Sequence, residues 1–157
     1  MKAASIAEIK QELSAATSAE LVALCLRLAK FKKENKELLS YLLFEMQDEQ
    51  QFIENVKSET EEQFAGINYS HVYYAKKSLR KILRGINKFS RYSGVAQTET
   101  ELRLHFCAML KDSPLKIDRD KALNKIYTGQ LDKVKKLIGG MHEDLQYDYK
   151  KELAELL

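Results

Sequence analysis

Glycine and proline are scarce in this sequence, and their scarcity limits the folds that it can adopt. The 157 residues include only six glycines and one proline. Because these two residue types punctuate strands, turns and loops, so few of them favours long helices joined by short turns. The apolar residues agree with this interpretation, since they recur at spacings of three and four through most of the chain. We therefore expect an all-α protein.

Capping signals divide this helical pattern into seven or eight segments. In three places a serine or threonine precedes a glutamate by three residues, which is the signature of a capping box at the start of a helix. These pairs are Ser5 with Glu8, Thr17 with Glu20, and Thr98 with Glu101. We expect the helices to be mostly antiparallel, because short connections place consecutive helices side by side.

The positions of the most apolar residues suggest where the core lies. Residues 21–31 and 38–46 are apolar around most of a helical circumference, so we expect two buried helices that form a central hairpin, joined by a polar turn over residues 32–36. The length predicts a single all-helical domain over residues 1–157. Two architectures fit: a compact helical bundle, or a short HEAT-like stack of helical hairpins.

Charge is polarised in the middle of the chain, although the formal net charge is only +3. No carboxylate occurs between Glu62 and Glu99, whereas residues 45–62 are strongly acidic. The carboxylate-free stretch contains a predicted helix from Ser70 with seven cations, namely Lys76, Lys77, Arg80, Lys81, Arg84, Lys88 and Arg91. Six of them, all except Lys76, fall within an arc of about 100° opposite the apolar face, and Tyr73 shares this arc.

Three interpretations of this basic helix remain open. The acidic residues 45–62 could neutralise it across a helical hairpin, although exposed ion pairs contribute only about 0–1 kcal/mol each. The face could bind nucleic acid, with tyrosines that stack on bases. It could also bind an acidic protein partner, or the chain could form a homo-oligomer. The candidate binding residues are Lys77, Arg80, Lys81, Arg84, Lys88, Arg91 and Tyr73, each as a contact to a phosphate, carboxylate or base.

Catalytic chemistry has no motif in this sequence. His71, His105 and His142 lie in three different predicted helices without ligand spacing, so we expect no metal site. Cys25 and Cys107 both lie in apolar runs, where we expect buried thiols rather than nucleophiles or a disulfide framework. No glycine-rich phosphate loop is present. We expect no enzymatic activity, no cofactor and no small-molecule substrate.

The expected environment is the cytoplasm. The longest apolar run, residues 21–26, is far shorter than the roughly 20 residues that span a bilayer, so we expect no integral membrane association. Residues 1–13 lack the continuous apolar stretch of a secretory signal. The chain is thus predicted to be a non-catalytic helical interaction or scaffold module that binds a protein partner or itself. The alternative is binding of nucleic acid or another polyanion through residues 76–91.

The N-terminal part resembles a known family. A short first helix, a Ser-x-Glu-Leu start to the second and a leucine-rich third are similar to the opening of an uncharacterised all-helical bacterial family, catalogued as a domain of unknown function. The acidic and basic helices that follow extend the resemblance over roughly the first 90 residues. The resemblance implies a helical fold, and it implies neither an activity nor any functional residue.

Overall fold

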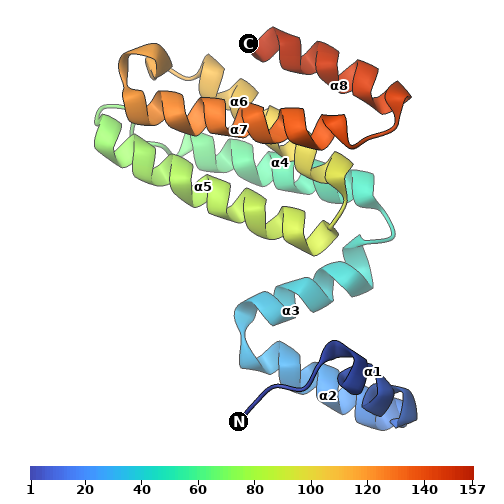
Figure 1. Cartoon of the computed structure of the whole chain (residues 1–157). Coiled ribbons are helices and arrows are strands. Elements are labelled where there is room, and N and C mark those ends of the chain that lie inside the picture. Colours follow the sequence, from blue (N-terminus) through green and yellow to red (C-terminus); the bar gives the residue numbers. More distant parts are fainter. The chain divides into compact units, whose positions relative to one another are not determined.

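The computed structural model describes all 157 residues, which form eight α-helices and no β-strand (Figure 1). The all-α prediction is confirmed. The contacts divide the chain into two compact units, Met1–Phe44 (unit 1) and Glu45–Leu157 (unit 2), which are described separately below. The expectation of a single domain over residues 1–157 stays a prediction.

Unit 1 contains three short helices. They are α1 (Ile6–Ala15), α2 (Ser18–Phe31) and α3 (Lys33–Ser40). Both predicted capping boxes are present at the starts of α1 and α2. The Ser5 hydroxyl accepts a hydrogen bond from the Glu8 N–H at 3.3 Å, and the Thr17 hydroxyl accepts one from the Glu20 N–H at 3.2 Å. These caps fix the starts of two helices that are too short to be stable by themselves in water.

The connection between α2 and α3 is shorter than expected. Lys32 alone separates the two helices, whereas the sequence predicts a polar turn over residues 32–36. The Asn35 side-chain amide donates a hydrogen bond to the Leu28 carbonyl at 2.8 Å, and this bond satisfies one of the carbonyls left open at the end of α2. A π-helical segment, η1 (Tyr41–Glu45), follows α3.

Unit 2 is a bundle around one central helix. Its elements are α4 (Glu49–Ala65), α5 (Val72–Ser93), α6 (Ala96–Asp112), the 3₁₀ turn η2 (Ile117–Arg119), α7 (Lys121–Gly139) and α8 (Glu143–Leu156). Helix α6 packs against α4, α5, α7 and α8, and Figure 1 shows α4 to α7 lying side by side. Burial of Leu102, Phe106, Cys107 and Leu110 on α6 makes it the core helix of the unit.

The predicted hairpin of residues 21–31 and 38–46 is present, since α2 and α3 pack against each other, but the prediction that it is buried at the centre of the fold is wrong. No residue of α2 or α3 is buried, and the core helix is α6 instead. Apolar periodicity records how hydrophobic a segment is, but it does not identify the surface that covers it. The segments 21–31 and 102–110 have similar patterns and opposite environments.

Two predicted helix starts are also corrected. Helix α6 begins at Ala96, so Thr98 lies inside the helix instead of capping it. The buried Thr98 hydroxyl donates to Glu49 Oε1 at 2.6 Å, which ties α6 to the first turn of α4. Helix α5 begins at Val72 rather than at Ser70, with His71 at the cap position.

A buried arginine links three helices of unit 2. Arg103 on α6 is only 3% exposed. Its guanidinium donates to Glu99 Oε1 at 2.8 Å, to Asn87 Oδ1 of α5 at 2.8 Å and to Gln130 Oε1 of α7 at 2.5 Å. Because the charge is both paired and hydrogen-bonded, the network can hold α5, α6 and α7 in register without leaving a bare charge in the core.

Candidate functional site

The structure brings five cations of α5 together on one exposed surface. Ala75, Leu79, Ile82 and Ile86 on the opposite side of the helix are buried in the core of unit 2. We use the term cationic face for the five exposed residues, Lys77, Arg80, Lys81, Arg84 and Arg91. None of their side chains forms an ion pair or a hydrogen bond within the protein.

The other two cations of the helix have different environments. Lys76 Nζ lies 2.9 Å from Asp120 Oδ2, and this hydrogen-bonded pair lowers the pKa of the Asp120 carboxyl. Lys88 is half-buried, and its ammonium lies 5.0 Å from the centroid of the Phe89 ring, a cation–π distance. Among the predicted binding residues, Lys88 is therefore the only cation that is partly buried rather than exposed.

Aromatic side chains extend the cationic face at its N-terminal end. The predicted residue Tyr73 is 71% exposed, and Tyr74 is 55% exposed. Their ring centroids lie 5.4 Å apart in an edge-to-face arrangement, and the His71 ring lies 5.9 Å from that of Tyr74. An exposed aromatic cluster therefore adjoins the exposed cations.

Several acidic residues of α4 have partners other than the cationic face. Glu54 Oε1 lies 3.2 Å from Lys57 Nζ, on the same helix. Glu61 Oε1 lies 3.2 Å from His105 Nε2 of α6. Glu49 accepts hydrogen bonds from the hydroxyls of Ser93 and Thr98. None of the α4 carboxylates forms an ion pair with a residue of the cationic face.

A polar cleft between α4, α6 and α8 was not expected from the sequence. It has a volume of about 560 Å³. Glu101 lines this cleft, where it pairs with Lys57 Nζ at 3.1 Å and accepts a hydrogen bond from the Tyr149 hydroxyl at 3.0 Å. Residues from three helices converge here, and no local spacing in the sequence reports their proximity.

Partial burial shifts the pKa values of groups in this cleft. Burial lowers the pKa of His105 and raises that of Glu152, with a further upward contribution from the neighbouring Glu101. Burial and the bond to Glu101 raise the pKa of Tyr149 to about 12. Each shift disfavours the charged form of its group. No group of three or more His, Cys, Asp or Glu side chains is arranged to hold a metal ion.

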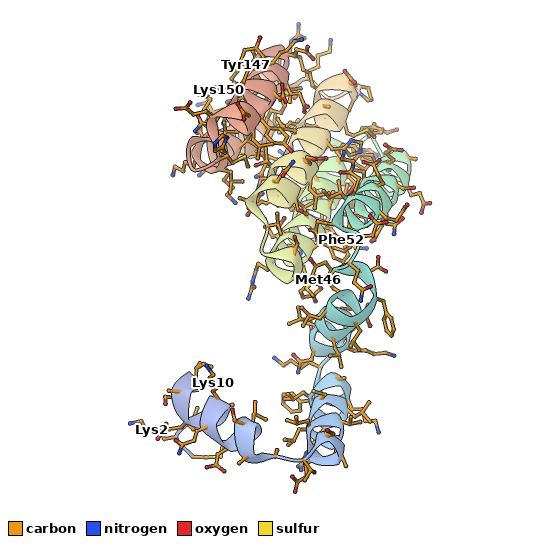
Figure 2. All side chains as sticks on the ribbon, turned by 90° about the vertical axis from the view of Figure 1, so that its right-hand side faces the viewer. Lys2, Lys10, Met46, Phe52, Tyr147 and Lys150 are labelled. Carbon is orange, nitrogen blue, oxygen red and sulfur yellow. The ribbon has the colours of Figure 1, made fainter.

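Exposed large apolar side chains are concentrated in unit 1. It holds less than a third of the residues but most of the exposed large apolar side chains. Twelve of them on its helices and on the segment that follows are 36–81% exposed: Ile6, Ile9, Leu13, Val22, Leu24, Leu26, Leu28, Phe31, Leu38, Leu42, Leu43 and Phe44. Figure 2 shows side chains standing out around the helices of this unit. We call these twelve residues the apolar surface of unit 1.

Two grooves cross this apolar surface. One lies between α1 and α2, has a volume of about 530 Å³ and is lined by Leu13, Ala16 and Leu24 among others. The other lies between α2 and α3, has a volume of about 210 Å³ and includes Cys25 and Leu28 in its lining. Cys25 is exposed, so the expectation that both thiols are buried is wrong for this residue. Cys107 is buried, and burial raises its pKa to about 12.

Comparisons of the chain with protein-family models, with curated proteins and with solved structures found no match. The resemblance to an uncharacterised bacterial family therefore stays a prediction, as does the cytoplasmic location. None of the helices combines the length and the apolar character that crossing a bilayer requires.

Proposed function

We propose that this protein is a non-catalytic interaction module that self-associates through the apolar surface of unit 1. The observation that supports the proposal is the exposure of α2, a mostly apolar helix with no buried residue. Monomeric proteins rarely expose contiguous apolar patches larger than a few hundred Å², and larger patches mark interaction sites. Covering such a surface with another protein removes its apolar side chains from water and therefore favours association.

The size of the surface suits a stable protein interface. Two of the twelve side chains are phenylalanines, for which a fully buried ring accounts for about 150–250 Å², and the other ten are smaller aliphatic side chains, so at 36–81% exposure the twelve together present on the order of 1,000 Å². Covering two thirds of this area on each of two copies would bury roughly 1,300 Å², within the range of about 1,200–2,000 Å² for specific stable complexes. Two copies of unit 1 can therefore supply a sufficient interface by themselves.

The charges of unit 1 favour a second copy as the occupant. Residues 1–44 contain seven basic and five acidic residues, and within α2 only Glu20, Arg27 and Lys30 are charged. Two copies of a surface with nearly balanced charge can approach each other without strong electrostatic repulsion. Two copies of a strongly charged surface would repel each other. A two-fold arrangement uses the same patch on both chains and closes after two subunits.

The proposal is tested by sedimentation equilibrium of the full chain over a concentration series. We expect a dimer that dissociates on dilution. Replacing Leu28 and Phe31 together by glutamate should weaken association by at least about 100-fold, because the two side chains are 61% and 77% exposed at the proposed contact. Tyr147→Glu is the matched control, since Tyr147 projects from α8 in unit 2 and is 74% exposed (Figure 2).

Two results would overturn this proposal. A strict monomer at every concentration would exclude a second copy as the occupant of the apolar surface. A dimer that survives the Leu28→Glu and Phe31→Glu changes unaltered would place the contact elsewhere on the chain. Circular dichroism of each variant verifies that its helices are retained.

A further inference from the structure

We propose that the cationic face of α5 binds single-stranded nucleic acid, with phosphates on its lysines and arginines and unpaired bases stacked on Tyr73 and Tyr74. This inference concerns unit 2 and does not depend on self-association through unit 1. It rests on two separate observations about α5, the unpaired cations and the exposed aromatic cluster.

The unpaired cations suit a chain of phosphates. Residues 77, 81, 84 and 91 follow spacings of three, four and seven, so they form one row along the helix over about 21 Å. Arg80 lies beside this row. Cations that already have an internal partner gain little from a new anion, but these five have none. Each can release a condensed counterion from a nucleic-acid backbone, which is the main source of affinity in such complexes.

The aromatic cluster favours unpaired bases. Tyrosine rings at 71% and 55% exposure present ring area to solvent at the end of the phosphate-binding row. A base can stack on a tyrosine ring only when one face of the base is not covered by a neighbouring base. Single strands supply such bases, whereas bases within a duplex are covered on both faces. Tyr73 lies on the same side of the helix as the cations, so a strand that follows the row reaches this ring without changing direction.

The burial of α5 argues against a membrane as the ligand. An amphipathic helix that binds a bilayer inserts its apolar face among the lipids. On α5 that face is occupied by the core of unit 2, where Ala75 and Leu79 are fully buried and Ile82 and Ile86 are 3% and 2% exposed. Only the charged side of the helix is available, and it carries tyrosines rather than an aliphatic surface.

Fluorescence anisotropy with a labelled single-stranded oligonucleotide of about 15 residues tests the proposal on the full chain. We expect saturable binding whose logarithmic dependence on salt has a slope of about −3 to −4, from five phosphates at about −0.7 each. Changing Arg80 and Arg84 to glutamine should reduce the affinity at least about tenfold and make the slope shallower by about 1 to 1.5. The matched control changes Lys133 and Lys136, two exposed lysines of α7, to glutamine.

A second pair of variants separates stacking from charge. Tyr73→Ala should lower the affinity for the single strand about tenfold without changing the salt slope, because it removes a ring and no cation. Tyr147→Ala, at an equally exposed tyrosine of α8, should have no effect. All these side chains are exposed, so the variants are expected to fold, and a thermal melt verifies this.

Four results would overturn the inference. The first is absence of oligonucleotide binding at low salt. The second is equal affinity for single strands and for duplex of the same length, which would remove the role of the tyrosines. The third is binding to vesicles with anionic lipid that is tighter than binding to the oligonucleotide. Equal losses in the α5 and α7 lysine or arginine variants would likewise show that net charge, rather than this face, binds the ligand.

Discussion

The guanidinium of Arg103 donates a hydrogen bond to Gln130 Oε1 at 2.5 Å, which joins the central helix of unit 2 to α7. The same side chain reaches Glu99 on its own helix and Asn87 on α5. Each named partner accepts from a charged donor, and Arg103 and Gln130 are 3% and 7% exposed, whereas Glu99 and Asn87 are partly buried. Removing the guanidinium would leave the Glu99 carboxylate and the amide oxygens of Asn87 and Gln130 without this donor. The free-energy cost of leaving acceptors unpaired exceeds the net stabilisation that the hydrogen bonds provide.

We predict that Arg103→Ala lowers the free energy of unfolding by about 3–5 kcal/mol, because it breaks a buried charge network from one side. Arg119→Ala is the control, since Arg119 is exposed and without an ion pair, and it should change stability by less than about 0.5 kcal/mol. Urea denaturation followed by circular dichroism measures both. Similar losses in the two variants would contradict the structural role given to Arg103.

The polar cleft predicts how stability depends on pH. His105 lies 3.2 Å from Glu61 but without the alignment of a hydrogen bond, and burial lowers its pKa below the ordinary 6.5. As pH falls through 6.5, the unfolded chain takes up a proton on this residue before the folded protein does. The contribution of His105 to the free energy of unfolding is therefore fully present above pH 6.5. It decreases as the pH falls below 6.5, by at most about 1.4 kcal/mol per pH unit.

His105→Gln should remove this contribution. The difference in unfolding free energy between the wild type and the variant should shrink as the pH is lowered from 7 toward 5, because only the wild type loses the histidine contribution. Chemical denaturation at a series of pH values measures the difference. Two parallel stability curves would show that His105 does not titrate differently in the folded and unfolded states.

Two glycines should respond to alanine in opposite directions. Gly129 lies inside α7, and a β-carbon there would have no atom within 4 Å, so Gly129→Ala should stabilise the protein by roughly 0.5–1 kcal/mol. Gly94 follows α5 with φ = 67°, a left-handed conformation, so Gly94→Ala should destabilise it by about 1 kcal/mol. Thermal melting of the two variants measures both signs. Destabilisation by Gly129→Ala would mean that α7 is not a continuous helix at that position.

The helices of this chain are predictable from sequence because their signals are local. The capping boxes at Ser5 and Thr17 each involve residues three positions apart, and the structure has both. Burial is a different property, because it depends on which segments meet in space. Residues 21–31 have a pattern as apolar as that of α6, so the sequence predicts a core helix where the structure has an exposed one.

The candidate sites divide in the same way. The cationic face follows from helical spacing along one segment, so the sequence predicts its five members together with Lys88, and the structure adds that Lys76 is paired with Asp120 and Lys88 lies over Phe89. The cleft around Glu101 draws on three helices separated by more than 40 residues, and no spacing rule reports it. The apolar residues of unit 1 are evident in the sequence, but their pattern predicts a core where the structure has an exposed surface.

The reactivity of Cys25 tests the central claim most directly, because this thiol lies in a groove of the apolar surface itself. Cys107 is buried and its pKa is raised to about 12, so in the folded protein a thiol reagent should react with Cys25 alone. The Cys25→Ser variant measures the background reaction. We predict that Cys25 reacts rapidly in dilute solution and progressively more slowly as the protein concentration rises and a second copy covers the groove. A rate constant that is the same at all protein concentrations would contradict self-association through unit 1.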